Sequence, residues 1–352
     1  MKTAVRLFAL AGFSILAAGY SVGSSASDKL PMCWSLAQLK HMRSESSIRK
    51  RIAAAYRAPL TGTPATIAIG SHFVRGAIRR VQLPSNVRKI ALTFDLCEQP
   101  YEISGYQGDI VDYLRDQKVP ATFFASGKWF LTHSERAQQI MADPLFEFGN
   151  HAWEHRNFRV LDRGRAQAEI NGAQLAYQRT FQKLSQWYCR VPNKAGSADT
   201  GVAKEMSLFR FPFGACNKQN LAWVNQSGLM AIQWDISSGD PWKGQTVAGV
   251  VNTVVSRARS GSIVLFHANG RGWKTGQALP QILRRLRARG FSFATVSDLL
   301  GTPGAMPVVS ETCYDARPGD TDRYDALSRK LEQRYQAFYR RFAKPRMNGV
   351  KR

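Results

Sequence analysis

The chain becomes strongly β-forming at Lys89-Ile-Ala-Leu-Thr-Phe94 and again at Ala121-Thr-Phe-Phe-Ala-Ser126. Between these two runs, residues 108–117 carry apolar side chains at helical spacing. A strand, an amphipathic helix and a second strand in this order are typical of a βαβ unit, in which the two strands lie parallel. The stretch therefore predicts an α/β fold built on a parallel sheet.

The same alternation continues from about residue 86 to residue 305. Further strands are expected at 145–149, 208–212, 229–234, 262–267 and 292–296, and further helices at 135–142, 163–184, 219–227, 247–259 and 277–289. About seven strands with crossover helices fit either an incomplete barrel or a doubly wound sheet, because periodicity alone does not separate these two architectures.

Two basic segments flank this region. Residues 27–85 lack the alternation, and we interpret them as an N-terminal extension that packs on the domain or is partly mobile. Residues 306–352 form a charged tail with apolar and aromatic side chains, such as Leu331, Tyr335 and Phe338, at roughly helical spacing. This spacing predicts an amphipathic surface helix, with a weak contact to anionic envelope polymers as the sharper alternative.

The composition indicates a folded protein that works among anionic partners. Of the 352 residues, 44% are hydrophobic and 11% aromatic, which is sufficient for the core of one large domain or two modest ones. Lys and Arg number 49 against 25 Asp and Glu, so the formal charge is +24. Such a charge favours acidic glycans, phospholipids or nucleic acid as partners. Nucleic acid is not expected, because zinc-finger, bZIP and RRM signatures are missing from the sequence.

The N-terminus predicts export. Lys2 and Arg6 precede an apolar run over residues 7–19, and Ser24-Ser25-Ala26 offers small side chains for cleavage. The run is too short for a transmembrane helix, which needs about 20 apolar residues. We therefore expect a signal peptide at residues 1–26 and a periplasmic or extracellular mature protein.

Export permits disulfides, and the mature chain contains cysteines at positions 33, 97, 189, 216 and 313. A bridge between Cys33 and Cys313 would tie the two ends of the fold together, although spacing does not determine the pairing. Cys97 and Cys216 also flank the motifs that carry the chemistry.

Chemically versatile side chains recur where the predicted strands end. They are Asp95 after the first strand, His151 and His155 after the third, Arg210 in the fourth, Asp240 after the fifth and His267 at the end of the sixth. In parallel α/β folds the carboxyl ends of the strands meet at one rim, where active sites are built. These residues therefore predict an active site at that rim.

The segment His151-Ala-Trp-Glu-His155 gives the strongest indication of a metal. Histidines four residues apart lie on one helix face and offer two imidazoles to one divalent ion, the alternative being two solvated histidines at a helix start. The order is not His-Glu-x-x-His, so a zinc peptidase is not supported. A third ligand, supplied by oxygen or sulfur, would leave one position open for water.

Taken in order, these motifs resemble the polysaccharide deacetylases of the NodB-like carbohydrate esterase group, carbohydrate esterase family 4. The resemblance covers about residues 90–300. It rests on Thr93-Phe-Asp95, Val119-Pro-Ala-Thr-Phe-Phe124, Phe148-Gly-Asn-His-Ala-Trp-Glu-His155, Phe209-Arg-Phe-Pro-Phe-Gly214, Trp234-Asp235 with Asp240-Pro-Trp242, and Gly261-Ser-Ile-Val-Leu-Phe-His267. It implies a distorted (β/α) barrel of about seven parallel strands within residues 86–305, and hydrolysis of N-acetyl groups on amino sugars of a polymer.

The resemblance also implies a role for each residue at the rim. His151 and His155 would hold a divalent metal, expected to be Zn²⁺. Asp95 would be the general base toward water, and His267 the general acid toward the departing amine. The remaining implied roles are orientation of Asp95 by Arg210, support of His267 by Asp240, and substrate contacts from Phe213, Trp242 and Leu265.

One position departs from the family pattern. The family follows its base with a second Asp that completes the metal triad, and here that position is Leu96. Glu98, or the thiolate of Cys97, would replace the missing carboxylate. A disulfide between Cys97 and Cys216 competes for that sulfur, and we predict this disulfide together with Glu98 as third ligand. Asp95 as a ligand in its own right is the other possibility, and it leaves the base unassigned.

Three functions remain open from the sequence. The first is an exported metal-dependent deacetylase acting on peptidoglycan, a chitin-like polymer or an exopolysaccharide, with the basic charge slightly favouring an acidic polymer. The second is a glycan-binding pseudoenzyme, and the third an O-acetyl esterase, because the same acid and base would serve an ester. The insertion at 186–205, with Trp187, Tyr188 and Cys189, would either line a glycan groove or form a surface loop.

Overall fold

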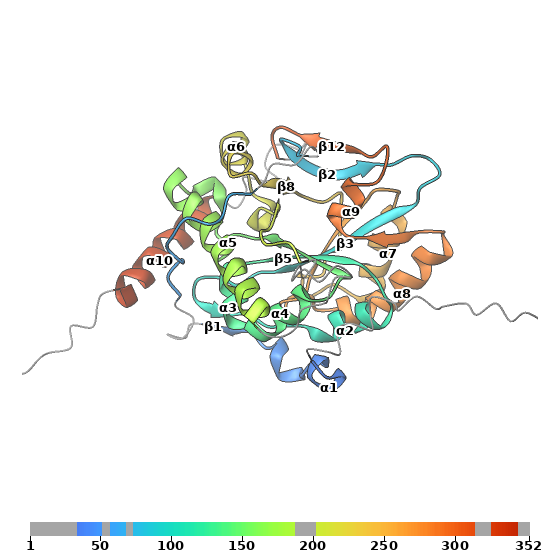
Figure 1. The fold of residues 1–352 in the computed structure, drawn as a ribbon, viewed down its shortest axis with the longest axis horizontal. Helices are drawn as coiled ribbons and strands as arrows, with labels where there is room; N and C mark the ends of the chain where they lie inside the picture. Colours follow the sequence, from blue (N-terminus) through green and yellow to red (C-terminus); the bar gives the residue numbers. More distant parts are fainter. Residues whose placement is uncertain (1–33, 51–56, 68–72, 187–201, 314–324, 344–352) are drawn as a thin grey trace, which may run out of the picture.

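The computed structural model describes residues 34–50, 57–67, 73–186, 202–313 and 325–343 (Figure 1). The predicted signal peptide, Cys33 and the Trp187-Tyr188-Cys189 part of the insertion lie outside these ranges. Among the helices that are described, none is both long enough and apolar enough to span a membrane.

A curled, mostly parallel sheet forms the centre of the protein (Figure 1). Its strand order is β12-β2-β8-β7-β6-β5-β3-β10-β9, and β11 pairs with β3. The strands are β2 (Ala77–Gln82), β3 (Lys89–Leu96), β5 (Ala121–Ala125), β6 (Phe146–Asn150), β7 (Leu208–Phe209), β8 (Met230–Ile232), β9 (Ile236–Ser237), β10 (Ile263–His267), β11 (Ser292–Ala294) and β12 (Met306–Ser310). A bridge between Arg80 and Ser262 brings β2 back beside the start of β10. The sheet thus closes into a distorted (β/α) barrel, which confirms the predicted fold class and decides against an open doubly wound sheet.

Strand β3 lies in the middle of this sheet. Each of its residues from Ile90 to Leu96 is buried, as is typical of parallel strands that are covered on both faces. It pairs in parallel with β5, β10 and β11. The register with β10 sets Asp95 opposite His267, so the two predicted catalytic residues end neighbouring strands at the same rim.

Helices surround the sheet (Figure 1). They are α2 (Gly108–Asp116), α3 (Gly127–Thr132), α4 (Ser134–Met141), α5 (Arg163–Gln186), α6 (Lys218–Gln226), α7 (Val247–Arg257), α8 (Thr275–Ala288), α9 (Val296–Leu300) and, near the C-terminus, α10 (Asp325–Ala343). Shorter elements are α1 (Leu36–Leu39), the 3-10 helices η3 (Arg43–Ser46), η5 (Phe158–Val160) and η6 (Pro212–Gly214), and β1 (Arg49–Lys50), which pairs with β4 (Glu102–Ile103). The long helices confirm the predicted ones to within a few residues, including the helix expected in the tail.

Two strands of the main sheet lie outside the range expected for the domain, residues 86–305. β2 precedes that range and β12 follows it, and the two pair with each other in antiparallel orientation. The sequence of β2 did not predict a strand, because Arg79 and Arg80 interrupt its apolar residues. Both arginines lie on the half-exposed part of the strand, and Arg79 Nη2 donates to the backbone carbonyl of Trp234 at 3.4 Å.

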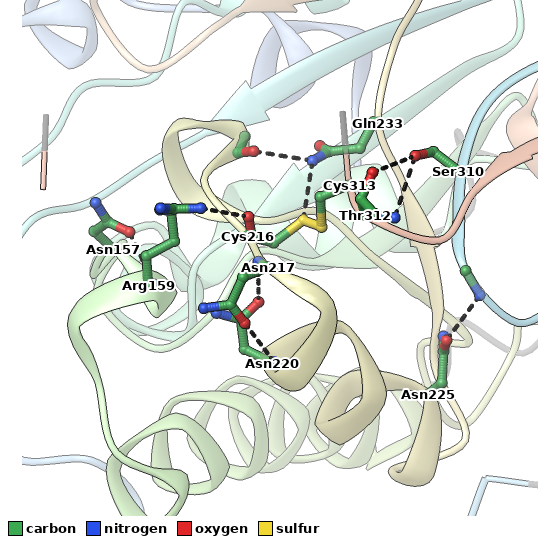
Figure 2. Close-up of a disulfide and its surroundings, with 12 residues drawn as sticks. Asn157, Arg159, Cys216, Asn217, Asn220, Asn225, Gln233, Ser310, Thr312 and Cys313 are labelled. Carbon is green, nitrogen blue, oxygen red and sulfur yellow. Dashed lines mark hydrogen bonds between the residues drawn. A yellow bond between two sulfur atoms is a disulfide. The ribbon is translucent and has the colours of Figure 1, made fainter. Parts of the chain in front are cut away.

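A disulfide joins Cys216 to Cys313 (Figure 2), with the two Cα atoms 5.7 Å apart. This pairing contradicts the predicted bridge between Cys97 and Cys216, and also the suggested bridge between Cys33 and Cys313. Cys97 is instead free and buried. The sequence did not predict the pairing of Cys216 with Cys313. Cys313 follows β12, and nothing in the sequence indicated that β12 pairs with β2.

Removal of this disulfide is expected to destabilise the oxidised protein. The bridged cysteines are 97 residues apart, and loss of a native cross-link typically costs about 2–5 kcal/mol. The Cys216→Ser/Cys313→Ser double variant should therefore melt at a lower temperature in scanning calorimetry. Peptide mapping without reduction should recover the cross-linked pair from the wild type, and equal melting temperatures would contradict a stabilising bridge.

Candidate active site

Residues from four strand ends meet at the rim of the barrel, as the sequence predicted. Asp95 ends β3, His151 follows β6, Arg210 follows β7 and His267 ends β10. Asp95 Oδ2 lies 3.5 Å from His151 Nε2, and its Oδ1 lies 2.9 Å from Arg210 Nη1. The rim therefore brings a carboxylate, two imidazoles and a guanidinium together.

Arg210 is fully buried and fixes the position of Asp95. Its Nη1 donates to Asp95 Oδ1 at 2.9 Å and to Thr93 Oγ1 at 2.7 Å. Its Nε and Nη2 donate to the backbone carbonyls of Ile232 and Gln233, both at 3.2 Å. Because these partners hold the planar guanidinium on several sides, one Asp95 oxygen is fixed and Oδ2 is left facing His151.

His151 and His155 lie on a turn, and the prediction that they share a helix face is wrong. Residues 151–155 are not helical, and Ala152 and His155 have φ angles of 64° and 58°. These left-handed conformations do not occur inside a right-handed helix. The turn nevertheless brings the two imidazole centroids to within 4.8 Å of each other, so the predicted pair is present.

Both imidazoles are prepared to accept a cation. Nδ1 of His151 lies 2.8 Å from the backbone carbonyl of Arg210, and because a carbonyl only accepts, Nδ1 carries the proton and Nε2 keeps its lone pair. Nδ1 of His155 is buried and has no hydrogen-bond partner among the described residues. Burial lowers the pKa of His151 and, more strongly, that of His155. Neutral imidazoles with free lone pairs are what a metal requires.

Glu98 does not lie with the histidines, so its predicted role as third ligand is corrected. Its Oε1 accepts from the Thr132 hydroxyl at 2.8 Å, and its Oε2 accepts from the backbone N–H and the hydroxyl of Ser104, both at 3.2 Å. The carboxylate is thus buried and already satisfied. The side chain that joins the two histidines is Cys97, and the possible ligand atoms of these three residues all lie within 4.8 Å of one another.

Asp240 holds His267, as the sequence predicted. The carboxylate Oδ1 lies 2.9 Å from His267 Nδ1, while Oδ2 accepts from the backbone N–H of His267 and from the Thr275 hydroxyl, both at 2.7 Å. Burial alone lowers the pKa of His267, but the charge and hydrogen bond of Asp240, with the charge of Asp95, outweigh burial and raise it. The arrangement therefore favours an imidazolium.

Two of the predicted substrate residues, Phe213 and Leu265, lie beside this cluster, and Trp242 lies two residues after Asp240 in the chain. Phe213 is half-exposed, with its ring centroid 4.3 Å from that of His155. Trp242 is 67% exposed. Leu265 is buried in β10, two residues before His267, so both side chains lie on the same side of the strand.

The loop between β10 and α8 supplies site residues that the sequence analysis missed. Asn269 donates to the backbone carbonyl of Cys97 at 2.7 Å. Arg271 Nη2 donates to Glu102 Oε2 at 2.6 Å, while its Nη1 is buried without a partner among the described residues. Trp273 has an exposed aromatic ring, and the Lys243 ammonium lies over it, 4.9 Å from the ring centroid. Their position in the sequence, directly after the His267 motif, could have indicated that they belong to the site.

Comparison with known proteins agrees with this geometry. A model of the polysaccharide deacetylase family matches residues 82–206. A peptidoglycan-N-acetylglucosamine deacetylase of Bacillus cereus is 30% identical over 222 residues, which are 62% of this chain and 91% of that protein. The chain belongs to the polysaccharide deacetylase family.

Other relatives extend the comparison. The chitooligosaccharide deacetylase of Azorhizobium caulinodans is 27% identical over 60% of this chain and 94% of its own. A crystallised peptidoglycan N-acetylglucosamine deacetylase shares the fold with a TM-score of 0.52 and 23% identity, over 64% of this chain and 93% of that one. A family 4 pseudoenzyme of Bacillus anthracis does so with a TM-score of 0.50 and 19% identity, over 65% and 70%.

In this polysaccharide deacetylase family member, α10 packs directly on the turn that carries His155. Arg156 Nη1 lies 2.7 Å from Glu332 Oε1, and the Arg156 guanidinium lies 5.5 Å from the centroid of the Tyr335 ring. Asn157 donates to the Ser328 hydroxyl at 2.8 Å. Because Arg156 and Asn157 directly follow His155, the helix restrains the backbone of a predicted metal ligand.

Loss of the Glu332 carboxylate should loosen this contact. Glu332→Ala removes a nearly buried partner of Arg156, and loss of a hydrogen bond to a charged group costs about 1–3 kcal/mol. We expect a lower melting temperature and faster hydrogen exchange in residues 151–160. Lys330→Ala, on the exposed side of the same helix, is the matched control and should change neither. Unchanged exchange in Glu332→Ala would contradict the restraint.

Proposed function

We propose that the protein is an exported, metal-dependent deacetylase that removes N-acetyl groups from amino sugars of an envelope polysaccharide. The observation that carries the proposal is that Asp95, His267 and two histidines suited to bind a metal, His151 and His155, lie together at one rim. The relatives named as peptidoglycan-N-acetylglucosamine and chitooligosaccharide deacetylases support the substrate class. The N-terminal sequence supports export, and the charge of +24 supports an acidic polymer.

The residues present fit a divalent metal. The unpartnered Nδ1 of His155 is the kind of buried nitrogen that a cation satisfies. The second nitrogen is Nε2 of His151, which lies 3.5 Å from both Asp95 Oδ2 and Cys97 Sγ. We infer that these two residues hold the ion. Once bound, a divalent ion such as Zn²⁺ supplies a Lewis acid that polarises the acetyl carbonyl.

Asp95 and His267 provide the proton transfers. Oδ1 of Asp95 is occupied by Arg210, so Oδ2 accepts the proton of the attacking water. Nδ1 of His267 is bound by Asp240, so Nε2 donates the proton that the amine nitrogen needs to leave. Arg210 and Asp240 act as positioning residues. Arg210 binds Oδ1 of Asp95 and leaves Oδ2 available for the reaction, and Asp240 binds Nδ1 of His267 and leaves Nε2 available.

The exposed aromatic side chains would bind the glycan. Phe213, Trp242 and Trp273 are 51%, 67% and 41% exposed. Aromatic side chains offer a large apolar surface of defined geometry, and their flat faces suit the apolar face of a sugar ring. Leu265, on the same side of β10 as His267, would close the acetyl pocket against water.

A glycan-binding pseudoenzyme is the second candidate, favoured by Leu96. This side chain is fully buried and apolar, so it cannot replace the carboxylate that the family pattern places there. The pseudoenzyme of Bacillus anthracis shows that the fold occurs without activity.

Acetate release separates these candidates. The purified protein should release acetate from N-acetylated peptidoglycan or chitooligosaccharide, lose this activity after chelation, and recover it with added Zn²⁺. Release from O-acetylated polymers alone would replace the amide reaction by ester hydrolysis. Glycan binding without any acetate release would instead favour the pseudoenzyme.

The role of His267 has a test with a matched control. His267→Gln should lower kcat by about 10²–10⁴-fold, the usual contribution of a positioned acid, while the metal content stays the same. His41 also pairs with an aspartate, Asp112, at the same Nδ1 to carboxylate distance of 2.9 Å, but belongs to the N-terminal segment. His41→Gln should keep wild-type turnover. Full activity of His267→Gln would exclude it as the acid.

A further inference from the structure

The two histidines leave the metal of the proposed function one protein ligand short. Catalytic zinc sites usually have three protein ligands and one open position. Leu96 cannot be the third ligand, because it is apolar and buried in the core. Glu98 is excluded by its own hydrogen bonds to Thr132 and Ser104. The third ligand must therefore come from another side chain of this rim.

Strand geometry directs Cys97 toward the site. Successive side chains of a strand point to opposite faces, so residues two apart share a face. Asp95 and Leu96 are the last two residues of β3, and Leu96 points into the core. Cys97 follows the strand directly, and its sulfur belongs to the same close group of ligand atoms as Asp95 and His267. A cysteine one residue after Leu96 therefore presents its sulfur to the rim.

The observed separation fits a shared zinc ion. Cys97 Sγ lies 3.5 Å from His151 Nε2. With Zn–S near 2.3 Å and Zn–N near 2.0–2.1 Å, two ligands at a tetrahedral angle stand about 3.6 Å apart. Cys97 also belongs to both groups of described side chains that offer close-set ligand atoms, one with the two histidines and one with Asp95 and His267.

The thiol is held in place and has no disulfide partner. Cys216, its predicted partner, is bonded to Cys313. The peptide that follows Cys97 is fixed at both of its polar groups, because Asn269 donates to the Cys97 carbonyl at 2.7 Å and the Glu98 N–H donates to the Ser126 hydroxyl at 2.8 Å. The sulfur is thus positioned before any ion binds.

We propose that the Cys97 thiolate is the third protein ligand of a Cys-His-His metal site. The inference rests on the metal of the proposed function. Binding replaces the S–H bond by an S–metal bond and releases one proton to solvent. A thiolate favours Zn²⁺ over harder ions such as Mg²⁺ or Mn²⁺. It also leaves the Asp95 carboxylate available as the base.

Cobalt substitution tests the ligand directly, without substrate. A thiolate bound to Co²⁺ gives a sulfur-to-metal charge-transfer band in the near ultraviolet, which nitrogen and oxygen ligands do not give. We expect this band in the wild type and its absence in Cys97→Ser. Since changes in outer-shell partners already cost about 10–100-fold in metal affinity, loss of this ligand should raise the Kd for Co²⁺ by at least that much.

Two further variants keep the test sharp. Cys97→Asp should bind Co²⁺ more tightly than Cys97→Ser but show no band, because a carboxylate replaces the sulfur. Glu98→Gln should keep the band, since Glu98 makes its contacts elsewhere.

A wild-type protein that binds Co²⁺ without the band overturns the assignment and points to Asp95. A wild type that binds no Co²⁺ overturns the metal chemistry as well, whereas the band without acetate release leaves the ligand assignment standing and removes only the deacetylase.

Discussion

The buried guanidinium of Arg210 is the contact on which the site depends. Its side chain holds the Asp95 carboxylate and two backbone carbonyls at the end of β8, and its own carbonyl fixes the tautomer of His151. One residue thus connects β3, β6, β7 and β8. A charge without solvent contact is stable only with its partners in place, and removal of one partner of a buried pair costs about 3–5 kcal/mol. The same contacts therefore stabilise the barrel and orient the base.

Much of this site was predictable because parallel strands end at the same rim. Asp95, Arg210 and His267 were placed by that rule alone, and the register of β3 with β10 confirms it. The histidine pair was found for an incorrect reason. A spacing of four residues suggested a helix, yet the chain uses a turn with positive φ at Ala152 and His155. Sequence spacing shows that two side chains can meet, but it does not show which backbone brings them together.

The failures concern contacts that depend on segments distant in the chain. The Cys216–Cys313 bridge required knowledge that β12 pairs with β2, and β2 is too polar to be predicted. Glu98 was predicted to be the third metal ligand, but its carboxylate accepts hydrogen bonds from Ser104 and from Thr132, which lies 34 residues further along the chain. A sequence motif does not show that hydrogen-bond donors compete with a metal for the same carboxylate. This competition becomes visible only when the neighbours are known.

The order of residues after β3 shows how chemistry can persist while a motif changes. The family pattern places its carboxylate directly after the base, and this chain places a leucine there. Because the Cys97 sulfur already lies among the ligand atoms of the rim, a cysteine can supply the missing donor. The Asn269 contact to the Cys97 carbonyl and the restraint of His155 by α10 then hold two members of the same cluster. Loss of one motif residue is therefore insufficient evidence for loss of the site.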